Sequence, residues 1–161
     1  MITATKQEEI LSLLDAILAK TADGDASLSA AMQLIADQLP CYNWVGIYLL
    51  QGEELILGPY VGAATEHTVI PVGQGVCGTA VATNTNQVVV DVRLRDNYLA
   101  CSLETRSEIV VLIRDPQTGE ILGQIDADGH TVGAFDTSDE ALLEAFAVRL
   151  APRLSRKVES L

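Results

Sequence analysis

Two cysteines lie in segments where a thiol could react. Cys77 stands between two glycines just before a predicted short helix over 79–83, and Cys101 lies in an irregular segment, 96–105, between two strand-like runs. Peptide N–H groups at a helix start carry partial positive charge, and a thiol there tends to have a lowered pKa. Two cysteines on loops that flank one strand are typical of a redox pair. Spacing alone nevertheless favours the commoner fate of free cysteines, which is to be small buried hydrophobic residues.

Three carboxylates form the second candidate group. Asp126 and Asp128 share one face of a predicted strand, and Glu108 begins the strand that pairs with it across the turn at 116–119. Carboxylates that converge repel one another unless solvent, a cation or a proton relieves them. A ligand ammonium would do so, and a protonated carboxyl group could donate a hydrogen bond to a substrate oxygen. The alternative is a solvated acidic surface, although aspartate is disfavoured in strands.

Aromatic residues mark a third candidate. Trp44, Gly46 and Tyr48 alternate along one strand, so they share a face, and simple strand geometry places the two rings about 13 Å apart. Because the glycine between them leaves the floor of the strand bare, a small ligand could lie between aromatic walls. The alternative is an ordinary aromatic face packed under a helix.

Other chemistry has little support in the sequence. His67 and His130 are far apart and lack partners at metal-ligand spacing, so we expect them at the surface and expect no metal site. The segment Gly73–Gly78 is rich in glycine, but it lacks the Lys-Ser/Thr pair of a phosphate-binding loop. We expect Cys41, which follows a proline, to be a buried structural thiol.

The elements that must position these residues are read from hydrophobic periodicity. Helices are expected over 6–21 and 27–38 and from 136 onwards, and Pro152 should kink or shorten the last one. The expected strands are 42–50, 55–57, 67–71, 87–92, 107–114 and 120–127, and 58–62 is expected to be a loop. Short turns between neighbouring strands imply an antiparallel sheet, with the terminal helices on one face and ligand loops on the other. The class is therefore α+β, in one domain spanning 1–161.

Composition narrows the function classes. The chain has 161 residues, a formal net charge of −12 and a pI near 4.3, a balance that repels nucleic acid and anionic membranes. We see no signal peptide or membrane span at the N-terminus. Three cysteines are too few for a disulfide framework, so a cytoplasmic location is expected, where disulfides are transient and catalytic or redox-sensing.

Six short segments, in this order, carry a resemblance to a known family. They are Trp44-x-Gly46-x-Tyr48, Leu57–Tyr60, Ile70–Ala80, Ala100-Cys101, Ser107–Val110 and Ile125-Asp126-x-Asp128. Together they resemble the free methionine-(R)-sulfoxide reductases, which are stand-alone GAF domains. The resemblance covers nearly the whole chain, and it implies the GAF fold and reduction of the R-sulfoxide of free, not protein-bound, methionine.

The resemblance also implies roles for individual residues. Cys101 corresponds to the catalytic cysteine and Cys77 to a second redox cysteine that closes a disulfide with it. The residues that correspond to the substrate pocket are Trp44, Tyr48, Glu108, Asp126 and Asp128, with Glu108 or Asp128 holding the sulfoxide oxygen. No cofactor is implied. The disulfide would be reduced by a thioredoxin-like partner, and a symmetric homodimer is expected.

The chain departs from the family pattern in two places. Many members carry a third redox cysteine in the segment that here reads 62–68, and this segment has none. A common Gly-His-Ile-Ala-Cys-Asp run appears here as Asn97–Ser102. Two alternatives stay open, a GAF module that binds a small ligand without turnover and a non-catalytic redox sensor that uses the two cysteines.

Overall fold

The computed structural model describes residues 1–95 and 103–160, with side chains as far as 154. The helices are α1 (Ala4–Lys20), α2 (Gly24–Gln38), α3 (Gly75–Thr83) and α4 (Thr137–Ser160), with one 3₁₀ turn, Val92–Leu94. The strands are β1 (Trp44–Gln51), β2 (Glu54–Val61), β3 (Val69–Pro71), β4 (Gln87–Val89), β5 (Ser107–Arg114) and β6 (Ile121–Gly129). Among the described residues, no helix is long and apolar enough to span a membrane.

The strands form one six-stranded sheet in the order β3-β2-β1-β6-β5-β4, and every neighbouring pair is antiparallel. The central strands β1, β6 and β5 are the most buried strands of the sheet. As predicted, β5 and β6 are joined by the short turn that contains Pro116 and Gly119. The α+β class with an antiparallel sheet is therefore confirmed.

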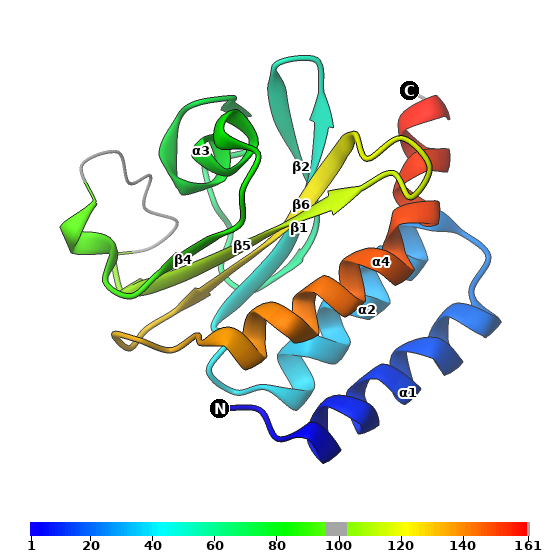
Figure 1. Cartoon of the computed structure of the whole chain (residues 1–161), viewed down its shortest axis with the longest axis horizontal. Helices are drawn as coiled ribbons and strands as arrows, with labels where there is room; N and C mark the ends of the chain where they lie inside the picture. The colour runs from blue at the N-terminus through cyan, green and yellow to red at the C-terminus, as the bar shows by residue number, and fades with distance from the viewer. Residues whose placement is uncertain (96–102, 161) are drawn as a thin grey trace.

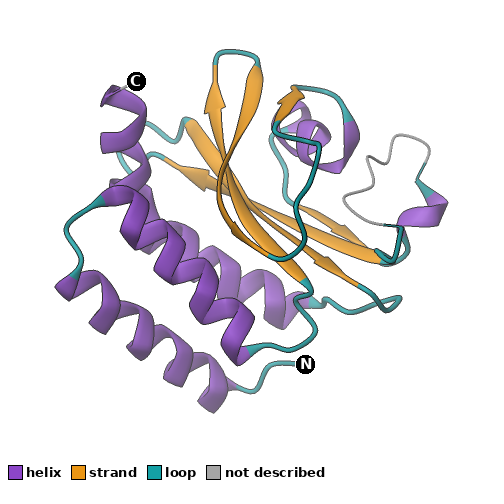
Figure 2. Ribbon diagram, turned by 180° about the vertical axis from the view of Figure 1, so that it is seen from behind, coloured by secondary structure: helices purple, strands orange, loops and turns teal. Residues whose placement is uncertain are grey.

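The two faces of the sheet have different cover. Helices α2 and α4 pack on one face, and α1 lies outside them, mainly against these two helices (Figure 1). Figure 2 shows the short helix α3 on the opposite side of the sheet. Alternation explains the division, because Val45, Ile47 and Ile125 point into the helix-covered core whereas Tyr48 and Val110 point toward α3.

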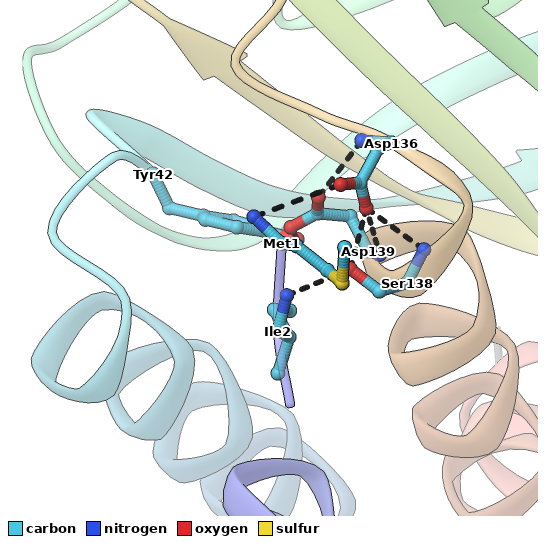
Figure 3. Close-up of polar contacts among 6 residues, drawn as sticks. All are labelled: Met1, Ile2, Tyr42, Asp136, Ser138 and Asp139. Atoms are coloured by element: carbon cyan, nitrogen blue, oxygen red, sulfur yellow. Dashed lines mark hydrogen bonds and ion pairs between the residues drawn. The ribbon is translucent and has the colours of Figure 1, made fainter. Parts of the chain in front are cut away.

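The start of α4 is fastened to β1 and to the N-terminal segment. Asp136 and Asp139 accept each other's backbone N–H groups at 3.4 and 2.8 Å, the reciprocal arrangement of a capping box. The other oxygen of Asp139 accepts the Tyr42 hydroxyl at 2.8 Å (Figure 3). The backbone N–H of Ile2 donates to the Ser138 hydroxyl at 2.8 Å. These bonds fix the helix that covers the core.

Several element bounds differ from the prediction. Strand β2 runs through the expected loop as far as Val61, and Pro59 is tolerated because the pairing of β2 with β3 ends at Ile56, which leaves that edge open. Helix α3 begins at Gly75 rather than at 79, so Cys77 lies inside its first turn. Helix α4 continues past Pro152 to Ser160 and bends in its last turns (Figure 1), as expected for a proline inside a helix.

Candidate functional site

The register of three strands brings the three carboxylates together. On the face away from the long helices, Asp128 lies between Trp44 of β1 and Glu108 of β5, and Asp126 lies between Gly46 and Val110. All three acids are buried, with exposed fractions of 3 % for Glu108, 0 % for Asp126 and 1 % for Asp128. The predicted convergence on one sheet face is thus present, but the predicted solvated surface, its alternative, is not.

Cys77 on α3 contacts this cluster from the side of the sheet on which the three acids lie. Its Sγ atom lies 3.9 Å from Oε2 of Glu108, and the sulfur and one oxygen each of Glu108 and Asp126 all lie within 4.8 Å of one another. Helix α3 can approach this closely because the fully buried Gln124 on β6 donates its amide to the Cys77 carbonyl at 3.1 Å. Gln124 was not among the residues predicted for the site, although alternation along β6 places it on the same face as Asp126.

The surroundings of Glu108 and Asp126 favour the protonated form of their carboxyl groups. Burial raises the pKa of Glu108 well above its usual range, and the neighbouring charges of Asp126 and Asp128 raise it further. Burial also raises the pKa of Asp126, which the nearby Glu108 and Cys77 partly offset. Neither oxygen of Asp126 has a hydrogen-bond partner among the described residues. A carboxyl group in this cluster can therefore serve as a proton donor at neutral pH, and the cluster can accept a cation.

The aromatic residues differ from the predicted arrangement of separated walls. The rings of Trp44 and Tyr48 are 6.5 Å apart between centroids, not 13 Å, because the indole folds back over Gly46. A Cβ atom at Gly46 would lie 2.6 Å from the indole, so the glycine makes room for the ring and is not a bare floor. The indole stacks on Tyr60 at 5.4 Å and donates its N–H to the Ala63 carbonyl at 3.1 Å.

Two pockets open around the acids. One is lined by Cys77, Glu108 and Asp126 together with His67 and Gln74. The other is lined by Trp44, Asp128, Thr105, Glu104 and His130. Asp126 and Asp128, which are two residues apart on β6, thus line different pockets.

Tyr48 lines neither of these pockets. It is completely buried, and its hydroxyl donates to the backbone carbonyl of His67 at 2.8 Å. It therefore fixes the segment that carries His67 at the pocket rim. His67 is half-buried there, whereas the exposed His130 fits the expectation of a surface histidine.

Comparison with known proteins assigns the family. A model of the GAF domain matches residues 23–154. The free methionine-R-sulfoxide reductase of Escherichia coli (strain K12) is 38 % identical over 78 % of this chain and 74 % of its own length. The chain belongs to the free methionine-R-sulfoxide reductase family. This confirms the resemblance seen in the sequence and, with it, the GAF fold.

Solved structures of family members agree with this assignment. The free methionine-R-sulfoxide reductase from Neisseria meningitidis, in complex with its substrate, has a TM-score of 0.88 and 31 % identity, and the match covers 100 % of this chain and 96 % of that one. A type II free methionine-R-sulfoxide reductase from Thermoplasma acidophilum has a TM-score of 0.79 and 38 % identity, covering 83 % of this chain and 93 % of that one.

Two of the three cysteines lie within the described residues of this family member. Cys77 is 4 % exposed, as expected of a thiol in a pocket wall. Cys101, the predicted nucleophile, lies outside the described residues. The prediction for Cys41 is wrong, because this thiol is exposed in the turn between α2 and β1 rather than buried. The preceding Pro40 ends the helix early and leaves the turn at the surface.

Proposed function

We propose that this chain reduces free methionine-(R)-sulfoxide to methionine with a pair of redox-active cysteines. The observation that carries the proposal is the buried group of Glu108, Asp126 and Asp128 beside Cys77, in a chain of this family. Relatives that bear the name of this activity, one of them solved with its substrate, support it. Neither oxygen of the buried Asp126 has a hydrogen-bond partner among the described residues, and the ammonium group of a free amino acid would compensate this carboxylate.

We assign the binding of the substrate to the two pockets. Asp126, which lines one pocket, and Asp128, which lines the other, neutralise the ammonium group from neighbouring positions on one face of β6. Trp44 packs against the apolar end of the substrate, and Tyr48 acts indirectly by holding the His67 segment at the rim. A peptide-bound sulfoxide would bring an uncharged amide in place of the ammonium and leave the carboxylates uncompensated.

The chemical step uses Cys101 as the nucleophile and Glu108 as the acid. The Cys101 thiolate attacks the sulfoxide sulfur while Glu108, or Asp128 in its place, donates a hydrogen bond to the oxygen. The oxygen, with one proton from the acid, is then transferred to the Cys101 sulfur: the transient bond between the two sulfurs and the S–O bond of the substrate break, methionine leaves, and Cys101 becomes a sulfenic acid. The sulfoxide sulfur is reduced by two electrons and the Cys101 sulfur is oxidised by two.

Cys77 completes the cycle in this proposal. Its thiol attacks the sulfenic acid, water leaves, and a Cys77–Cys101 disulfide forms. A thioredoxin-like dithiol then reduces the disulfide and becomes a disulfide itself. We place this reaction in the cytoplasm and in a symmetric homodimer that forms through the helix-covered side. Light scattering at micromolar concentrations tests the assembly, and a monomeric mass would exclude it.

The decisive experiment compares substrates that differ in one feature. The R epimer of free methionine sulfoxide, its S epimer and the N-acetylated R epimer are each supplied with a thioredoxin system. We expect turnover of the free R epimer alone. Comparable rates on the N-acetylated compound would show that recognition of the ammonium by the carboxylates is wrong. No turnover of any compound would leave a binding module or a redox sensor as the better description.

Cysteine variants separate the three thiols in the same assay. Cys101→Ser should abolish turnover, and Cys77→Ser should stop the recycling by thioredoxin after a single turnover. Cys41→Ser is the matched control, because this thiol is exposed and lies in the turn before β1. Full multiple turnover by Cys77→Ser would overturn the assignment of Cys77 as the resolving thiol.

A further inference from the structure

We propose that Cys77, Glu108 and Asp126 of the reduced protein bind Zn²⁺, and that the bound ion excludes the substrate. No metal site was expected from the sequence, because its ligands are not at short spacing along the chain. The fold instead gathers the three ligands from α3, β5 and β6. The blocking of the substrate rests on the proposed function, whereas the binding of the ion does not.

The ligand types and distances suit a tetrahedral ion. Zn²⁺ takes thiolate at about 2.3 Å and carboxylate oxygen at about 2.1 Å, so ligand atoms around it lie about 3.5 Å apart. The Cys77 sulfur lies 3.9 Å from Oε2 of Glu108, and one ligand atom from each of the three residues falls within 4.8 Å of the other two. Movements of the side chains by up to about 1 Å would bring the ligand atoms to these distances, and water would fill the fourth position.

A second, independent observation points to a cation. Asp126 is completely buried, and neither of its oxygens has a hydrogen-bond partner among the described residues. No lysine or arginine is among the described residues that line this pocket. An unpaired buried carboxylate is costly, and a bound cation removes this cost.

The sulfur atom distinguishes zinc from other cations. The ammonium group of an amino acid would satisfy the carboxylates, but it would not use the Cys77 sulfur as a ligand. Mg²⁺ prefers six oxygen ligands in octahedral geometry and is unsuited to a thiolate. Zn²⁺ uses all three groups, and its binding releases the thiol proton to solvent without any change in oxidation state.

The binding test uses Co²⁺ as a visible substitute on the reduced, metal-free full chain. We expect a sulfur-to-cobalt charge-transfer band with tetrahedral absorption, displaced by Zn²⁺ but not by Mg²⁺. Cys77→Ser should remove the charge-transfer band. Asp126→Asn should keep the band but weaken Zn²⁺ affinity at least about tenfold, the size of effect expected when a metal site loses a supporting group. Cys41→Ser is the matched control and should bind as the wild type does.

The results divide cleanly. An unchanged band in Cys77→Ser, or loss of the band in Cys41→Ser, would overturn the site. Equal Zn²⁺ affinity in wild type and Asp126→Asn would also overturn it. Because these readouts are spectroscopic, they test the metal site even if the chain turns over no sulfoxide.

The second test asks whether the ion and the substrate compete. Zn²⁺ added to the sulfoxide assay should raise the apparent KM without lowering kcat, and a chelator should reverse the effect. Methionine sulfoxide should in turn displace Co²⁺ and bleach its spectrum. A fall in kcat at constant KM, together with a cobalt spectrum that the substrate leaves intact, would overturn the blocking.

Discussion

Two groups of buried acids in this chain have opposite surroundings. At the start of α4, each carboxylate oxygen of Asp139 accepts a hydrogen bond at 2.8 Å, one from the Tyr42 hydroxyl and one from the backbone N–H of Asp136 (Figure 3). On the open face of the sheet, the groups that interact with Glu108 and Asp126 are each other, Asp128 and the Cys77 thiol, and neither oxygen of Asp126 has a hydrogen-bond partner among the described residues.

The difference separates an acid that stabilises the fold from acids kept for a ligand. Buried polar groups that are fully hydrogen-bonded fix one conformation, and the group at α4 does this for a helix that covers the core. Buried carboxylates with unsatisfied oxygens cost stability, which is typical of sites that a ligand completes. Substitutions in the two groups should therefore affect different properties, activity in one and stability in the other.

The largest expected effect is the loss of turnover in Glu108→Gln. The amide keeps the shape of the side chain but cannot supply the proton, so kcat for free methionine-(R)-sulfoxide should fall about a hundredfold or more. The melting temperature should stay the same or rise, because a buried ionisable group has been removed. Steady-state kinetics and thermal unfolding followed by circular dichroism measure the two quantities.

The control for this variant is Glu120→Gln, which makes the same chemical change at an exposed position in the β5–β6 turn. It should leave both kcat and melting temperature unchanged. If Glu108→Gln were destabilised but kept a near-normal kcat, Glu108 would be an acid that stabilises the fold, as Asp139 is. The two groups of acids would then not differ in their roles.

The second prediction concerns Asp139 at the start of α4. Asp139→Asn should lower the free energy of unfolding by about 1 to 3 kcal/mol, because the amide nitrogen cannot accept one of the two hydrogen bonds. The kcat of the folded fraction should not change, since Asp139 lies on the helix-covered side. Urea unfolding of Asp139→Asn, Tyr42→Phe and the double variant measures the coupling between the pair. Additive losses would show that the Tyr42–Asp139 bond contributes nothing.

The sequence was sufficient for the part of the site that follows from strand alternation. Asp126 and Asp128 share a face because they are two residues apart on a strand, and the short turn before β6 brings Glu108 opposite Asp128. The same reasoning applied to Gln124 would have added the anchor of α3. The helix-covered face was likewise predictable from the apolar residues that alternate with the acids.

Features that depend on long loops or on side-chain direction were not predictable. The contact between Cys77 and Glu108 requires α3 to fold back over the sheet, and no local pattern encodes that distance. The 13 Å spacing predicted for Trp44 and Tyr48 assumed side chains perpendicular to the strand, but the indole leans over Gly46 toward Tyr60. Gly46 makes room for the indole because it has no Cβ atom. From the sequence alone, this glycine indicates only an empty position on the strand face, not which side chain fills it.

The smallest expected effect is a difference in how stability varies with pH. Hydrogen bonds from the Ser138 side chain and nearby backbone hold the pKa of Asp136 at about 2, below its ordinary 3.8. A carboxyl group with a depressed pKa stabilises the fold above its unfolded-state pKa, and this contribution is lost as the pH falls toward 2. Asp136→Asn should therefore cost about 0.5 kcal/mol or less near neutral pH, since solvent screens this exposed group, and nothing near pH 2.

Asp126→Asn should change the pH dependence of the free energy of unfolding in the opposite direction to Asp136→Asn. The pKa of Asp126 is raised in the folded protein, so its unfavourable ionisation destabilises the fold as the pH rises from the unfolded-state value through the folded one. Glu108 and Cys77 face this carboxyl group, and Glu108, whose pKa is also raised, contributes to the same loss. Relative to wild type, Asp126→Asn should gain stability as the pH rises above the ordinary aspartate pKa of 3.8, whereas Asp136→Asn should lose stability as the pH rises from about 2 to 3.8. Urea unfolding across this range measures both slopes, and parallel curves for the two variants would mean that the two groups of acids do not differ in their cost to the fold.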